Sequence, residues 1–75
     1  MEMDNEAFFR MGESLRLKGF RHLDMYTWLY DNYHRWIRVD VLNDEYAELN
    51  FFDEERFIAS FDEISKGLEY FGDYD

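Results

Sequence analysis

Two alternating segments on either side of a short polar loop constrain the fold of this chain more than any other feature. Residues 36–42 and 46–52 place β-branched, aliphatic or aromatic side chains at every second position. The apolar positions are Ile37, Val39, Val41, Ala47, Leu49 and Phe51. A period of two with these residue types is typical of strands that bury one face.

The loop between these segments fixes their pairing. A two-residue turn at 43–44 would set Val39 against Glu48 and would place polar groups on the apolar face. A three-residue loop at 43–45 sets Val39 against Leu49 instead, and one face is then apolar throughout. We therefore expect an antiparallel hairpin with an acidic three-residue loop.

The same rule predicts a further strand after the acidic run at 53–55. A three-residue loop there pairs Phe51 with Phe57 and Leu49 with Ala59, which keeps the apolar face continuous. The expected sheet is a three-stranded antiparallel meander.

Helices are predicted on both sides of this meander. Apolar residues at helical spacing indicate a helix from about 4 to 18 that ends at Gly19. Ser60 and Glu63 form a capping-box pattern at the start of a C-terminal helix over about 61–71.

The segment 20–33 carries two competing patterns. The positions with helical spacing are Leu23, Tyr26, Tyr30 and Tyr33, and the positions that alternate are Leu23, Met25, Thr27 and Leu29. Its length and the Asp31–Asn32 break favour a helix over about 23–32. The predicted fold is one α+β domain over residues 1–75, with two N-terminal helices, a three-stranded antiparallel meander and a short C-terminal helix.

Charge is distributed unevenly along the chain. The net charge is −10. Residues 1–42 hold seven acidic and six basic residues, a balance of −1, and residues 43–75 hold eleven acidic and two basic residues, a balance of −9. Direct binding to nucleic acid or to an anionic membrane is disfavoured, because like charges repel. A protein with a basic surface is the expected partner.

Several functional classes find no support in the sequence. The chain has no cysteine, so it has no disulfide or thiolate site, which fits a reducing cytoplasm. No stretch approaches the roughly 20 apolar residues of a membrane span, and no signal peptide precedes the domain, so we expect a complete, soluble, cytoplasmic protein. His22 and His34 stand outside any recognised metal or triad spacing, and the acidic runs lack the glycine of a calcium loop. We expect no catalysis, no metal and no cofactor.

The acidic and aromatic residues after position 43 are the candidate partner-binding site. Its members are Asp44, Glu45, Tyr46, Glu48, Phe52, Asp53, Glu54, Glu55, Asp62 and Glu63. Carboxylates among aromatic residues fit an interface with buried anchors and a charged rim. Two alternatives stay open: the acidic half serves solubility alone, or the chain is an assembly protein. In the second case an interface centred on the near-neutral residues 20–38, which include Tyr26, Trp28, Tyr30 and Tyr33, forms a homodimer or docks on a larger complex.

A small, acidic, cysteine-free domain without a catalytic motif is similar in character to the inhibitor proteins that phages and mobile elements direct against host nucleases, glycosylases or DNA-packaging proteins. Many of these proteins mimic DNA by placing carboxylates where a basic groove receives phosphates. The similarity lies in overall character and carries no residue correspondence. It implies that acids on turns and on the last helix occupy a basic cleft.

Overall fold

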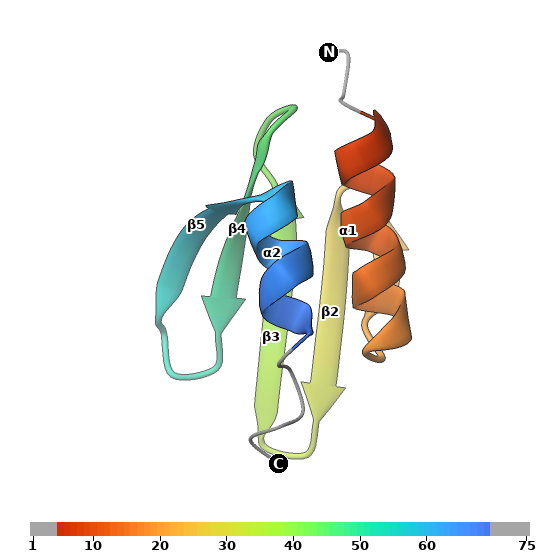
Figure 1. Cartoon of the computed structure of the whole chain (residues 1–75). Coiled ribbons are helices and arrows are strands. Elements are labelled where there is room, and N and C mark those ends of the chain that lie inside the picture. The colour runs from red at the N-terminus through yellow and green to blue at the C-terminus, as the bar shows by residue number, and fades with distance from the viewer. Residues whose placement is uncertain (1–4, 70–75) are drawn as a thin grey trace.

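The chain forms a mixed α+β fold in which each strand turns back beside the previous one (Figure 1). The computed structural model describes residues 5–69. The five strands form one antiparallel sheet in the order β1-β2-β3-β4-β5. The elements follow the chain as α1 (Asn5–Leu17), β1 (Arg21–Asp24), β2 (Thr27–Asn32), β3 (Arg35–Val41), β4 (Tyr46–Phe51), β5 (Arg56–Ser60) and α2 (Phe61–Leu68).

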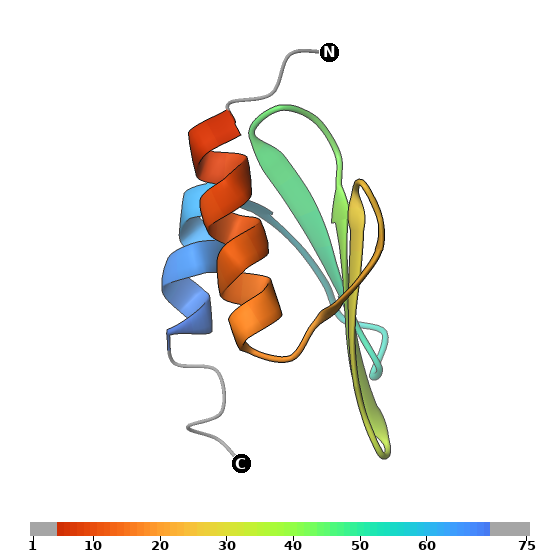
Figure 2. The ribbon, with the colours of Figure 1, turned by 90° about the vertical axis from the view of Figure 1, so that its right-hand side faces the viewer.

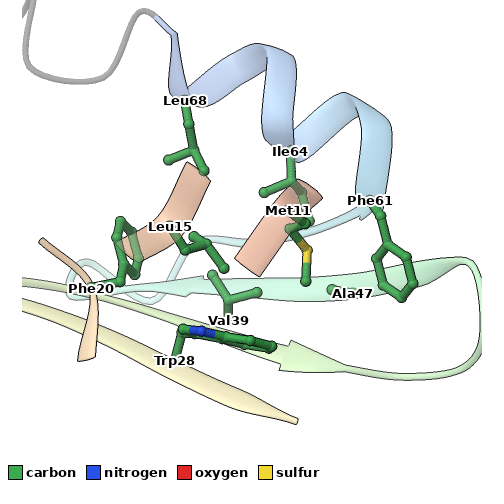
Figure 3. Packing of buried hydrophobic residues seen from close by; sticks show 9 residues of the cluster. All are labelled: Met11, Leu15, Phe20, Trp28, Val39, Ala47, Phe61, Ile64 and Leu68. Carbon is green, nitrogen blue, oxygen red and sulfur yellow. The ribbon is translucent and has the colours of Figure 1, made fainter. Parts of the chain in front are cut away.

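Both helices lie on the same face of the sheet, and no helix formed by residues 5–69 lies over the other face (Figure 2). The core forms between these two layers (Figure 3). Its buried members are Met11, Leu15, Phe20, Trp28, Val39, Ala47, Phe61, Ile64 and Leu68. Helical spacing supplies the residues from α1 and α2, and alternation supplies those from β2, β3 and β4, so the two periodicities meet in one layer.

The first helix agrees with its prediction: it ends at Leu17, and Gly19 follows as the predicted stop. The Phe20 N–H donates to the Leu15 carbonyl at 3.0 Å, and the Gly19 N–H donates to the Arg16 carbonyl at 3.0 Å. This pair of bonds is a Schellman motif, in which the residue after the helix adopts the left-handed conformation. Gly19 has φ +92° and meets this requirement without a Cβ clash.

The predicted helix over 23–32 is wrong. That segment forms the hairpin β1–β2, so the N-terminal half has one helix and the sheet has five strands instead of three. The Asp24 carboxylate accepts the Tyr26 N–H at 2.8 Å and stabilises the two-residue turn between the strands. The packing of Trp28 explains why this segment is extended and not helical. On β2 its ring lies in the core, 3% exposed, and stacks on the His22 ring with 4.4 Å between ring centroids.

The register predicted for β3 and β4 is confirmed. Val39 pairs with Leu49, Ile37 with Phe51 and Val41 with Ala47. The Asn43 side-chain oxygen stabilises the three-residue loop between β3 and β4. It accepts the N–H groups of Glu45 and Tyr46, each at 2.8 Å.

The register predicted for β4 and β5 is wrong by two residues. Leu49 pairs with Phe57, and Ala47 pairs with Ala59. The Phe51 N–H donates to the Glu55 carbonyl at 2.9 Å, so the loop consists of residues 52–54. A shift of two residues leaves every side chain on its expected face, because the side-chain period of a strand is two.

The predicted capping box at the start of α2 is confirmed. The Glu63 N–H donates to the Ser60 hydroxyl oxygen at 3.1 Å, and the Ser60 N–H donates to the Glu63 carboxylate at 3.2 Å. Phe61, Ile64 and Leu68 are buried, as their spacing predicts. The predicted end of this helix at residues 71–72 lies outside the described residues.

Candidate functional site

The acidic candidates fall into two groups at opposite ends of the sheet. Strands alternate in direction, so the β3–β4 loop lies at the end where both helices begin, and the β4–β5 turn lies at the other end (Figure 1). The first group is Asp44, Glu45, Asp62 and Glu63, and the second is Asp53, Glu54 and Glu55. Tyr46, Glu48 and Phe52 lie on or beside β4 between the groups.

Backbone bonds hold the first group together. The Phe61 N–H donates to the Glu45 carbonyl at 3.0 Å, which ties the β3–β4 loop to the first turn of α2. A depression of about 320 Å³ lies at this junction. It is lined by Ala7, Asp44, Glu45, Ser60, Phe61 and Asp62. The start of a helix carries partial positive charge, so these acids lie where the helix dipole stabilises them.

Only part of this first group is neutralised. Arg10 of α1 bonds to Asp62 at 2.8 Å and to Glu6 at 3.3 Å. Within residues 5–69, no basic side chain forms an ion pair with Asp44, Glu45 or Glu63. All three of these residues are exposed.

Two shifted pKa values report the local field in this group. Hydrogen bonds from the Ser60 N–H, and then from its hydroxyl, lower the pKa of the Glu63 carboxyl. The negative charge of Glu45 raises the pKa of the Tyr46 phenol, with a hydrogen bond between the two side chains as the next cause. Glu63 therefore stays ionised and Tyr46 stays neutral at physiological pH.

The second group surrounds a tight turn. The Asp53 carboxylate accepts the Glu55 N–H at 3.2 Å, and Glu54 adopts φ +71°. Arg35 lies near the Phe52 ring, 5.8 Å from its centroid. Phe52 is half exposed, so its ring presents an apolar surface beside the three carboxylates.

Glu48 differs from the other acidic candidates because it faces its own strand neighbours. It lies opposite Asp40 across β3 and β4. The Asn50 amide donates to Glu48 at 3.0 Å, and Arg56 lies 3.9 Å from it. The other arginine beside this pair, Arg38, bonds to Asp40 at 3.0 Å.

The four aromatic residues of the assembly alternative do not form one patch. Trp28 is buried, and Tyr30 packs on Phe20 with 5.4 Å between ring centroids. Tyr26 lies in the β1–β2 turn and Tyr33, which is 96% exposed, lies in the β2–β3 turn at the other end of β2. These four side chains therefore do not share one contiguous surface.

The structure does bring together an apolar surface that sequence analysis missed. A depression on the uncovered sheet face is lined by Leu23, Asp24, Thr27, Leu29, Asp31, Trp36 and Arg38. The alternation of Leu23, Thr27 and Leu29 was the signal for this surface, because residues at every second position share one face of a strand.

No family model, curated protein or solved structure matches this chain. In the described part of the chain, no three histidine or acidic side chains are grouped as metal ligands. Across residues 5–69, neither helix has the length and apolar character that a membrane crossing requires. The function is therefore inferred from the arrangement of charge and apolar surface.

Proposed function

We propose that this protein is a non-catalytic acidic interaction protein that binds a basic nucleic-acid-binding protein and competes with its nucleic acid. One observation carries the proposal. Residues 43–69, which form β4, β5, α2 and their loops, hold nine acidic and two basic residues, a balance of −7. Residues 5–42 hold five acidic and six basic residues, a balance of +1.

The fold turns this sequence asymmetry into a spatial one. The strand order follows the chain order, so β4 and β5 form one side of the sheet and β1 and β2 form the other (Figure 1). One side of the molecule is strongly negative and the opposite side is nearly neutral. A nucleic-acid-binding protein presents the complementary feature, a basic surface that receives phosphates.

The dimensions of the molecule suit such a surface. Its longest dimension is 36 Å, close to one turn of duplex DNA, about 34–36 Å. The two acidic groups lie at the two ends of the sheet, so they reach separate parts of a basic groove. An inhibitor of the DNA-mimic kind, as phages and mobile elements use against host defence proteins, requires this arrangement.

Attraction and anchoring have separate roles in this mechanism. Long-range attraction by the acidic side speeds association and weakens with salt. Tyr46 and Phe52, both partly exposed beside carboxylates, supply apolar contacts that slow dissociation. We place this function in the cytoplasm, because the chain has no cysteine.

Matched charge reversals test the proposal. Asp44→Lys with Glu45→Lys changes the first group, and Glu54→Lys with Glu55→Lys changes the second while retaining the Asp53 bond of the turn. Glu13→Lys with Asp31→Lys is the control, because it changes the net charge equally on the nearly neutral side. Proteins captured from a cell lysate by each immobilised variant are compared at low and high salt.

We expect both acidic-group variants to capture less of the partner, because their association rate should be at least tenfold lower than that of the unmodified protein. The binding that remains should no longer depend on salt. The control variant should retain most of the binding. If all three variants lose binding equally, the net charge and not the acidic side determines it. If none loses binding, the acidic residues serve solubility alone.

A further inference from the structure

The two edges of the sheet differ in their protection against strand addition. β1 has four residues, a register shift between His22 and Asp24, and charged side chains. Such features are typical of edges that resist pairing. β5 instead forms a regular edge whose residues Phe57 and Ile58 are 54% and 63% exposed. In the described structure β5 pairs with β4 alone.

The backbone of β5 presents groups along this edge that pair with no other residue among 5–69. Hydrogen-bonded pairs alternate along an antiparallel ladder. The bonds from Phe51 N–H to Glu55 and from Phe61 N–H to Glu45 set this alternation. The N–H and C=O groups of Arg56 and Ile58 therefore point away from β4. The next outward N–H, that of Ser60, is already bonded to Glu63 at 3.2 Å, so the capping box ends the open edge.

An apolar groove lies beside the same edge. It has a volume of about 290 Å³, roughly twice that of an engineered cavity that holds benzene. Phe57 and Ala59 of β5 contribute to its wall, so it reaches the edge strand. The other lining residues come from β3, β4, both helices and Phe20, and include Leu49, Phe51, Glu63, Ile64 and Leu68. An apolar side chain on an added strand would enter here.

Charge decides which strand can be added. The edge lies on the side of the molecule whose residues carry the balance of −7, and a second copy would bring two such sides together. A basic segment is attracted instead. Glu54 and Glu55 flank one end of β5, and Asp62 and Glu63 flank the other. A strand of five residues spans about 17 Å, so a segment of five to seven residues reaches both pairs.

We propose that the open edge of β5 binds an extended segment of the partner as a sixth strand, with lysine or arginine at the ends of the segment and an apolar residue in the groove. This inference rests on the proposed function, because it specifies how the basic partner is held. Main-chain bonds to Arg56 and Ile58 supply the ladder, the groove selects the apolar residue, and the flanking acids select charge.

Three peptides test the inference on the 75-residue chain. The probe is Lys-Lys-Val-Thr-Val-Lys-Lys with blocked ends. The second peptide is the same sequence N-methylated at its three central residues, which keeps the charge but removes the main-chain donors. The third replaces every lysine with glutamate. Affinity is measured by calorimetry, and binding is located by amide shifts in NMR spectra.

We expect the unmodified lysine peptide to bind at least tenfold more tightly than either control and to shift the amides of Arg56 and Ile58. Two protein variants provide the reciprocal test. Ile58→Pro removes the outward N–H, and Ile58→Ala removes the same side chain but keeps that N–H. Proline is tolerated on an edge strand, and circular dichroism verifies the fold. Ile58→Pro should bind at least tenfold more weakly than Ile58→Ala.

Three results would overturn the inference. Equal binding of the methylated and unmodified lysine peptides would mean attraction by charge alone, which leaves the proposed function intact. A wild-type dimer in ultracentrifugation that Ile58→Pro abolishes would make a second copy the occupant. If the peptide binds the Phe71→Ser variant but not the unmodified chain, the occupant of the groove is the chain's own segment 70–75 and not a partner. The proposed function is tested separately, by the charge reversals above.

Discussion

Asp40 and Glu48 face each other across β3 and β4, and each is held by a different arginine. Arg38 lies 3.0 Å from Asp40, and Arg56 lies 3.9 Å from Glu48. Thr27 also donates to Asp40 at 3.2 Å. The uncovered sheet face thus neutralises its own like-charge pair and contributes little to the negative side of the molecule.

This arrangement predicts the effect of removing one arginine. Arg38→Ala should lower the free energy of unfolding by about 0.5–1 kcal/mol, because the repulsion between Asp40 and Glu48 is then uncompensated. Urea denaturation at low and high salt measures the loss, which salt should reduce. Adding Glu48→Gln should recover part of the stability. A double variant no more stable than the single one would contradict this account.

The two tryptophans should report the hairpin that replaces the expected second helix. Trp28 is buried at 3% exposure, while Trp36 is 40% exposed on the uncovered face. Trp36→Phe should leave emission that is blue-shifted and protected from acrylamide, because a buried indole is removed from water. Trp28→Phe should leave emission that acrylamide quenches readily. Equal quenching of the two variants would place Trp28 outside the core.

Two glycines should respond oppositely to alanine. Gly19→Ala should lower the free energy of unfolding by about 1–2 kcal/mol, because φ +92° is unfavourable for a residue with a Cβ. Gly67 lies inside α2 with open space at its Cβ position. Gly67→Ala should raise stability by up to about 1 kcal/mol, because alanine favours helix. Thermal or urea unfolding measures both, and a stabilising Gly19→Ala would exclude the Schellman ending of α1.

The capping box should make the stability of α2 depend on pH through Glu63. The pKa of Glu63 is lowered in the folded state, so its contribution is present above the unfolded pKa, about 4.3. The contribution is lost as pH falls through the lower folded value. Glu63→Gln should therefore be less stable than wild type at neutral pH and should converge with it in acid. Glu69→Gln controls for the loss of one negative charge. A gap that stays constant from neutral pH down to about pH 3 would contradict this capping role.

Sequence reasoning located the parts of the fold that local chemistry specifies. Ser60 with Glu63, Gly19, and the pairing of Val39 with Leu49 follow from caps, turns and alternation, and all are confirmed. Residues 21–32 have both periodicities, and contact with the other elements decides between them. Trp28 fills the core only if that segment is extended, and this packing is not visible in local sequence.

The composition of the candidate site and its division between two turns were predictable, but the packing around it was not. The excess of acids after position 43 is a property of the sequence. Their separation into two ends of the sheet follows from the predicted meander, because consecutive hairpin turns lie at opposite ends of a sheet. The edge position of β5 also follows from that meander, but the groove beside it depends on how the helices pack on the sheet.

Competition with nucleic acid is the most direct test of the central claim. Proteins captured from a lysate by the immobilised wild-type chain are challenged with duplex DNA, and in parallel with salt of the same ionic strength. We predict that DNA releases the captured protein, that matched salt does not, and that the released protein binds nucleic acid on its own. Retention of the captured protein in the presence of excess DNA would contradict the claim that the acidic side occupies a nucleic-acid site.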